Sequence, residues 1–354
     1  AISKCHADSS AFLKREKAFA YNLLGVIVDY QSNYDSALFY YFKSLALFKE
    51  LNDKSGIMFR YNNIAVAYQH IGNYPLSIKY LLLGLENAPN IKSTARLMQN
   101  LGEVYLAMNE YTKAKASLLS ALKLYNYDKD EPDNTGEAYV NEKLGNLYST
   151  MGKADSAIYY LTNALQINER AQHKNGMAQD HYYFGLHYKN NNKWLEVVKE
   201  AKSAIDIHRQ DGEKFGVAES TLLLAEAQYK LNKLDEALNY SLEGIALSRE
   251  IKAKEPQKGY LELLVNIYAS QKNFAKAYWH SQQLNILKDS LNNEEKIKQV
   301  ANMEALYEND KKEKELALVR AQKLTADAQL SAEETKATLL IAGLGLVTLI
   351  LVLG

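Results

Sequence analysis

The residues most often used for metal binding or nucleophilic catalysis are few and scattered in this chain of 354 residues. The seven histidines are His6, His70, His173, His181, His187, His208 and His280. His181 and His187 fall within one predicted helix, but their spacing places them on different faces, which argues against a metal site. The single Cys5 has no partner for a disulfide or a paired metal-ligand motif. The sequence also lacks a phosphate-binding glycine loop and the common hydrolase motifs, so we expect no catalytic residue, no metal and no cofactor.

Asparagine and glutamine offer a different chemistry, because a side-chain amide both donates and accepts hydrogen bonds. Such residues recur in this chain, for example at Asn62, Asn63, Gln69, Gln99 and Asn100. A row of amides on one surface suits the backbone of an extended polypeptide. An equally favoured interpretation is that these amides lie on a helix face that contacts only water. To choose between a binding surface and a solvated face, one must know which secondary-structure elements carry these residues.

Residues 136–170 show what those elements are. Leu144 and Tyr148 lie on one face of a predicted helix, and Ala157 and Leu161 lie on one face of the next, because spacings of three, four and seven return to the same side of a helix. Between them Gly152 breaks the helix, since glycine accepts the left-handed conformation that ends helices. The stretch therefore predicts two amphipathic helices joined by a tight turn.

The same pattern recurs along most of the chain. The buried face of each second helix opens on a residue that is usually small, and successive copies are 37 to 43 residues apart: Ala37, Ser77, Ala114, Ala157, Val197, Ala237 and Ala277. Twelve residues before each lies a small residue of the first helix, at Gly25, Ala65, Gly102, Gly145, Gly185, Ala225 and, less closely, Val265. One such hairpin cannot bury its own apolar faces, so the units must stack on one another.

This period and pattern resemble the tetratricopeptide repeat, in a version of about 40 residues with lengthened helices. The resemblance covers about residues 18–290 and implies an all-α, right-handed superhelical solenoid of about seven helix-turn-helix repeats. We expect residues 1–17 to form a lead-in and residues 18–287 to form the repeat array. The 42 basic and 42 acidic residues cancel, so the composition gives no sign of a basic face for nucleic acid.

In the family that the chain resembles, the first helices of the repeats line a concave groove. The resemblance therefore implies that first-helix residues outside the core contact a peptide or protein ligand. The candidates are Asn22, Asn62, Asn63, Gln69, Gln99, Asn100, Glu103, Glu142, Asn146, Tyr182, Lys189 and Glu226. Glu219 and Glu262 are expected on the same surface.

Beyond residue 287 the 40-residue register stops. Residues 288–336 lack proline and glycine and are rich in Ala, Glu, Lys, Leu and Gln, which predicts a long helix. Its apolar positions keep only partial heptad spacing around a wholly polar run at 308–315, so we expect a weak coiled coil that allows a homodimer.

Residues 337–354 contain no charged side chain, and eleven of the eighteen are Leu, Ile or Val. At about 1.5 Å per residue they form roughly 27 Å of helix, close to the thickness of a membrane's hydrocarbon core. The stretch predicts a transmembrane helix, with a buried core helix as the alternative. Because no polar flank follows it, we expect the natural chain to continue beyond Gly354.

The order of repeats, charged helix and span resembles bacterial one-span sensors with a histidine kinase or a LuxR-type helix-turn-helix as output. This resemblance implies a non-catalytic sensor region outside the cytoplasmic membrane, which binds a peptide or protein and signals through residues 288–336 and the span. The output domain would follow Gly354. Two alternatives stay open, namely a tail-anchored scaffold or assembly factor and a soluble peptide-binding regulator.

Overall fold

A computed structural model of the protein describes residues 2–31, 33–127, 133–292, 325 and 335–336, with only the helical backbone for residues 2–10. The chain divides into two compact units, Ala1–Lys296 and Ile297–Gly354. Most of the described residues belong to the first unit, and every regular element among them is a helix.

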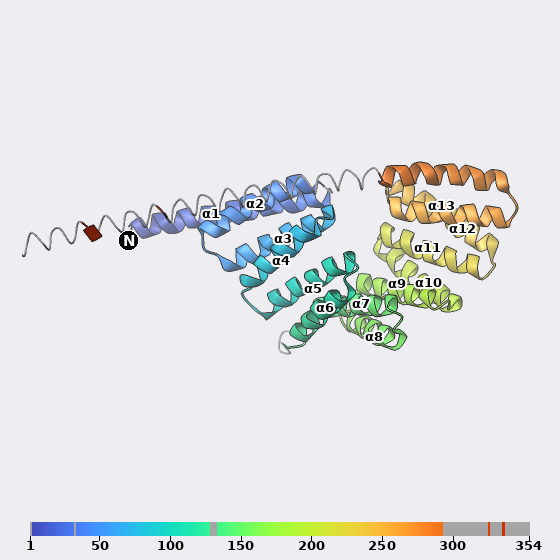
Figure 1. Cartoon of the computed structure of the whole chain (residues 1–354), viewed down its shortest axis with the longest axis horizontal. Coiled ribbons are helices and arrows are strands. Elements are labelled where there is room, and N and C mark those ends of the chain that lie inside the picture. Colours follow the sequence, from blue (N-terminus) through green and yellow to red (C-terminus); the bar gives the residue numbers. More distant parts are fainter. Residues whose placement is uncertain (1, 32, 128–132, 293–324, 326–334, 337–354) are drawn as a thin grey trace, which may run out of the picture. The chain divides into compact units, whose positions relative to one another are not determined.

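The helices of the first unit pack against one another in chain order (Figure 1). Their bounds are α1 Ile2–Tyr30, α2 Tyr34–Glu50, α3 Lys54–Ile71, α4 Tyr74–Glu86, α5 Ile91–Ala107, α6 Tyr111–Tyr125, α7 Asn134–Thr150, α8 Ala154–Arg170, α9 Lys174–Asn190, α10 Trp194–Asp211, α11 Lys214–Lys230, α12 Leu234–Glu250 and α13 Lys254–Ser270. Residues 274–292 are also helical and complete a seventh pair with α13. Odd-numbered helices from α3 to α13 also contact the next odd-numbered helix. Their common surface, together with that of α1, is called the odd-helix face below.

Ten turns between helices share one backbone geometry. In each, a residue with positive φ stands just before the N-cap of the next helix, as Gly152 and Gln172 do. The N–H of the following residue then donates to a carbonyl five residues back, for example from Lys153 to Tyr148 at 2.9 Å. This is the hydrogen bond of a Schellman helix end. From residue 152 to residue 272 the positive-φ residue recurs every 20 residues, so one helix and its turn make half of the 40-residue repeat.

The small residues that set the repeat in the sequence are buried between paired helices. Six of the seven second-helix residues, from Ala37 to Ala237, have no exposed surface, and Ala277 is nearly as buried. On the first helices, a Cβ added at Gly145 would lie 2.6 Å from Cδ2 of Leu161, so glycine is needed for the close approach of α7 to α8. The predicted all-α array of helix-turn-helix units is confirmed.

The predicted limits of the array stay predictions, and the helices are placed against them as follows. The described residues of the expected lead-in at 1–17 belong to α1, because no glycine or proline interrupts the chain before Gly25. The predicted boundary at 287 falls inside the helical residues 274–292. Most of the predicted long helix at 288–336 and the whole predicted span at 337–354 lie outside the described residues. Among the residues that are described, no helix is both long and apolar enough to cross a membrane.

Candidate functional site

All twelve predicted contact residues lie on odd-numbered helices, and eleven of them are partly exposed. They are Asn22 on α1, Asn62, Asn63 and Gln69 on α3, Gln99, Asn100 and Glu103 on α5, Asn146 on α7, Tyr182 and Lys189 on α9, and Glu226 on α11. The exception is Glu142 on α7, whose residue surface is only 4% exposed. The odd-helix face thus presents most of the predicted set to solvent.

At the N-terminal end of the face, asparagines join neighbouring helices. Asn63 Nδ2 donates to Asn22 Oδ1 at 2.8 Å, and Asn100 Nδ2 donates to Asn62 Oδ1 at 2.6 Å. We call these four residues the amide row. An amide has two N–H donors and two acceptor lone pairs, and each of these hydrogen bonds uses one donor of one amide and one lone pair of the other. The amide row therefore keeps donors and acceptors for a further polar ligand.

Next along the face, Glu103 on α5 lies among polar neighbours. Gln99 Nε2 donates to Glu103 Oε1 at 3.5 Å, and Tyr125 OH donates to Gln99 Oε1 at 3.0 Å. Burial raises the pKa of Glu103, although Lys143 and a hydrogen bond from Tyr139 oppose this shift. This carboxylate is therefore only partly compensated by its surroundings.

At the centre of the face, a lysine contacts several neighbouring side chains. Lys143 Nζ on α7 donates to Glu142 Oε1 at 2.8 Å and to Tyr183 OH on α9 at 3.0 Å, and lies 4.5 Å from the ring centroid of Tyr139. Burial raises the pKa of Glu142, and the charge of Lys143 opposes this. Glu142 therefore acts as the counter-ion of Lys143 beneath the surface.

The sequence prediction missed Lys143 and Tyr183. Each stands two residues before the small residue of its helix, Gly145 or Gly185. Asn63 and Asn100 were selected at the same register position, so the signal was present. Lysine and tyrosine at this position contact each other across two helices as the amides do.

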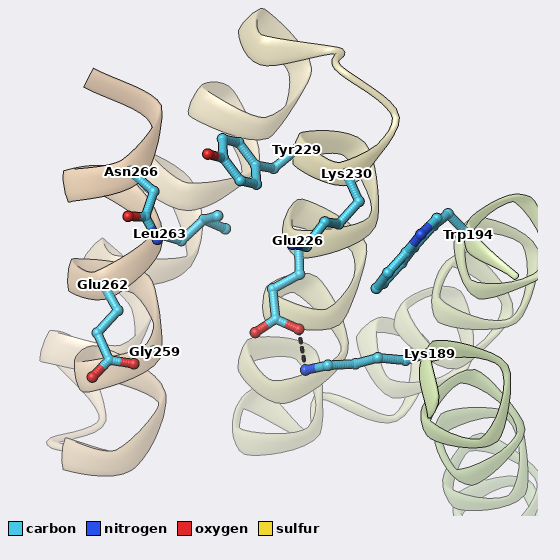
Figure 2. Close-up of a pocket in the computed structure, with 9 residues that line it drawn as sticks. All are labelled: Lys189, Trp194, Glu226, Tyr229, Lys230, Gly259, Glu262, Leu263 and Asn266. Carbon is cyan, nitrogen blue, oxygen red and sulfur yellow. Dashed lines mark hydrogen bonds and ion pairs between the residues drawn. The ribbon is translucent and has the colours of Figure 1, made fainter. Parts of the chain in front are cut away.

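A hollow of about 210 Å³ lies at the C-terminal end of the face, among α9, α10, α11 and α13. Its walls, which define the C-terminal hollow, are Lys189, Trp194, Glu226, Tyr229, Lys230, Gly259, Glu262, Leu263 and Asn266. Figure 2 shows Lys189 and Trp194 on one side, the α13 residues on the other, and the α11 residues between them. Lys189 and Glu226 form an ion pair across this hollow.

Two aromatic side chains give the C-terminal hollow apolar surface. Tyr229 stands four residues after the small residue Ala225, just as Lys189 stands four residues after Gly185. The repeat register of the sequence therefore indicates Tyr229 as well. Trp194 is the first residue of α10, an even-numbered helix, which a register counted on the odd-numbered helices does not reach. Polar groups beside aromatic walls are typical of sites that fix a ligand and bury part of its surface.

The two histidines of α9 have separate protein partners. His181 Nδ1 lies 2.6 Å from Glu200 Oε2, and His187 Nδ1 lies 3.2 Å from Ser149 Oγ. Within the described part of the chain, no group of three or more potential metal ligands comes together.

Two segments of the chain match family models described as "Tetratricopeptide repeat". They are residues 59–126, which extend from α3 to the end of α6, and residues 138–170, which lie on α7 and α8. Both segments coincide with helix pairs of the array.

A curated relative is the uncharacterized protein ycf37 of Guillardia theta, 36% identical over 107 residues, which are 30% of this chain. The match spans only 56% of that relative's length. The apo form of the quorum sensor NprR from B. thuringiensis is similar in structure, with 21% identity, a TM-score of 0.59, and 78% of this chain and 77% of NprR covered. A Rap protein complexed with Competence and Sporulation Factor gives 12% identity, a TM-score of 0.55, and coverage of 81% and 99%. At these identities, the two structures show a shared fold.

Proposed function

We propose that this chain, a tetratricopeptide repeat protein, is a non-catalytic binding module whose odd-helix face holds an extended polypeptide. The ligand would lie across the odd-numbered helices, from the amide row towards the C-terminal hollow. The partial exposure of eleven predicted contact residues, all on odd-numbered helices, supports this path.

The amide row carries this proposal. Its two hydrogen bonds join α1 to α3 and α3 to α5, so the amides follow the direction in which the helices succeed one another. A polypeptide backbone presents donors and acceptors in alternation, and an amide side chain can pair with both. Two neutral amides bonded to each other are also a weak interaction in water, about 1 kcal/mol, so a ligand can exchange their partners at little cost.

The C-terminal hollow supports the same function. Backbone contacts alone recognise no particular sequence, and selectivity needs pockets for side chains. The walls formed by Trp194, Tyr229 and Leu263 would take an apolar part of a ligand, and Asn266 and the Lys189–Glu226 pair would orient polar groups. The Rap protein with Competence and Sporulation Factor provides an example of this type of fold with a bound partner.

An array of randomised 12-residue peptides tests the proposal. The array is probed with the whole chain and with a double variant of the amide row, Asn62→Ala with Asn100→Ala. Each amide contributes about 1 kcal/mol of hydrogen bonding, so we expect the double variant to lose about tenfold or more in affinity for the peptides that bind.

The matched control is Asn163→Ala with Gln166→Ala, which removes two amides from the even-numbered helix α8. This control should bind the peptides within about twofold of the unchanged chain, since surface substitutions away from a site have small effects. Equal losses in both variants, or no peptide bound by the unchanged chain, would contradict the proposal.

The predicted segments at 288–336 and 337–354 favour a finer proposal, a membrane-anchored sensor whose repeat region lies outside the cytoplasmic membrane. The observation behind it is the uncharged stretch at the end of the sequence, with its eleven Leu, Ile or Val residues. Sedimentation with phospholipid vesicles, compared between the whole chain and a chain ending at residue 336, tests the anchor. Equal recovery of both chains with the vesicles would reject it, and the soluble peptide-binding regulator would then be preferred.

A further inference from the structure

A second hollow, of about 540 Å³, opens on the odd-helix face among α7, α9, α10 and α11. Its walls, which define the central hollow, are Tyr139, Glu142, Lys143, His173, Asn175, Gly176, Gln179, His208, Glu213, Phe215, Gly216 and Glu219. This volume is within the usual range of about 300–1,000 Å³ for ligand sites in proteins.

The charges in the central hollow are unbalanced. Three carboxylates, Glu142, Glu213 and Glu219, face one ammonium group, that of Lys143. Lys143 is already bonded to Glu142. Glu219 has neither a hydrogen bond nor an ion pair with any described residue. Burial together with the nearby charge of Glu213 raises its pKa, although the charge of Lys143 opposes this. A desolvated carboxylate in this position gains from a cationic partner.

His208 is an independent sign of a missing hydrogen-bond partner. It lines the central hollow, it is only 3% exposed, and its Nδ1 has no hydrogen-bond partner among the described residues. The carboxylate of Glu213 lies 3.8 Å from this nitrogen, beyond hydrogen-bonding distance. Burial lowers the pKa of His208, which keeps the imidazole neutral. In the tautomer protonated at Nε2, Nδ1 can accept a hydrogen bond from a donor of the ligand.

The aromatic walls favour a flat cation. Phe215 lines the hollow and is 46% exposed. Tyr139 lines the same hollow from α7. A guanidinium group stacks on aromatic rings and directs up to five N–H donors in one plane towards carboxylates. An ammonium group is a compact point charge with three donors and no flat surface.

We propose that the central hollow binds the side chain of an arginine in the polypeptide ligand. The guanidinium pairs with Glu219 and Glu213, donates to His208 Nδ1 and stacks on Phe215. This inference rests on the proposed function, because it assigns one side chain of a ligand held on the odd-helix face.

Two pools of fluorescein-labelled 12-residue peptides test this inference with the whole chain. Both pools are randomised at eleven positions, and the sixth position is arginine in one pool and citrulline in the other. Citrulline keeps the shape of arginine without its charge. By fluorescence anisotropy, we expect the arginine pool to bind about tenfold more tightly, which corresponds to about 1.4 kcal/mol. Glu219→Gln should remove most of this preference.

The matched control is Glu255→Gln, which removes a mostly exposed carboxylate at the start of α13, outside the central hollow. It should keep the preference for arginine. Equal binding of both pools by the unchanged chain, or an unchanged preference in Glu219→Gln, overturns the arginine site while the proposed function stands. Binding of neither pool overturns both.

Discussion

Asp180 is a carboxylate without exposed surface at the junction of α8 and α9. Asn168 Nδ2 donates to its Oδ2 at 2.7 Å, while its Oδ1 has no partner among the described residues. Burial raises the pKa of Asp180 to about 8, and the charges of Glu142 and Glu169 add to this. The folded protein therefore holds this side chain protonated at pH values where the unfolded chain, with a pKa of about 3.9, releases the proton.

The stability of the protein should consequently depend on pH through Asp180. Because the folded-state pKa is raised, the contribution to stability is fully present below about pH 4 and is lost as pH rises towards 8. Asp180→Asn should therefore be more stable than the unchanged chain at pH 8, and the difference should shrink towards pH 4. Each pH unit in this window changes the difference by up to about 1.4 kcal/mol, measurable by urea unfolding.

Asp206→Asn, at an exposed position of α10, is the control. Its urea midpoint should follow that of the unchanged chain across the same pH range. A difference between Asp180→Asn and the unchanged chain that stays constant with pH would show that Asp180 does not titrate as described.

The polar residues of the odd-helix face were predictable because they follow the repeat register. Buried polar residues such as Asp180 and His208 were not, since one sequence without a structure shows no burial. Glu142 illustrates the limit: its register position is that of a surface residue, but its side chain turns under Lys143. Trp194 shows another limit, because it reaches the C-terminal hollow from an even-numbered helix, α10.

At the scale of the elements, the ten shared turns place seven non-glycine residues in the left-handed conformation. Asn52, Asn109, Asn192 and Asn232 tolerate it through their short polar side chains. Gln172, Lys252 and Lys272 have no such advantage and are strained there. Three glycines, at 72, 152 and 212, hold the same position without strain.

Glycine at a strained turn should stabilise the array. Gln172 has a φ of 52° between α8 and α9, and Gln172→Gly removes the Cβ that opposes this conformation. We expect the free energy of unfolding to rise by about 0.5–1 kcal/mol. This is less than the strain removed, because glycine also increases the conformational entropy of the unfolded chain. Thermal unfolding followed by circular dichroism measures this as a rise in Tm.

The matched test introduces glutamine in place of glycine at the turn 40 residues after Gln172. Gly212→Gln places a side chain at a φ of 71°, where an added Cβ meets no atom within 4 Å. It should lower Tm through backbone strain alone. If both variants moved Tm in the same direction, side-chain contacts rather than φ would determine stability at these turns.

The turns explain why the helices were easier to predict than their ends. Gly152 has a φ of 70° and confirms the predicted break, because glycine is an unambiguous signal. Lys252 adopts the same conformation, although nothing in a lysine predicts it. Its turn lies 40 residues after that of Gly212 and joins α12 to α13, which pack on each other.

At the scale of the molecule, the first unit is an array in which helices contact mainly their neighbours along the chain. The core is accordingly divided into clusters, one of which joins Met58, Ala65, Leu81, Leu97 and Leu101. Stability in such an array is a sum of repeat and interface contributions, so damage should remain local.

Leu97→Ala tests this locality. Leu97 on α5 has no exposed surface, and truncating a buried leucine costs about 2–5 kcal/mol. Hydrogen exchange measured on peptic fragments should become faster in α3 to α6 and remain unchanged in α11 to α13. Leu261→Ala on α13 should give the opposite distribution. Uniform acceleration in every helix would instead indicate a single cooperative unit.

The constant spacing of the turns also bears on how such a gene can change length. Between residues 152 and 272 each turn offers the same backbone geometry at the same interval. A recombination event that joins one such turn to the second turn after it therefore removes or duplicates one complete helix pair and preserves the alternation of odd and even helices. Unequal crossing-over at these positions would lengthen or shorten the odd-helix face by whole repeats, and with it the length of polypeptide that the face can accommodate.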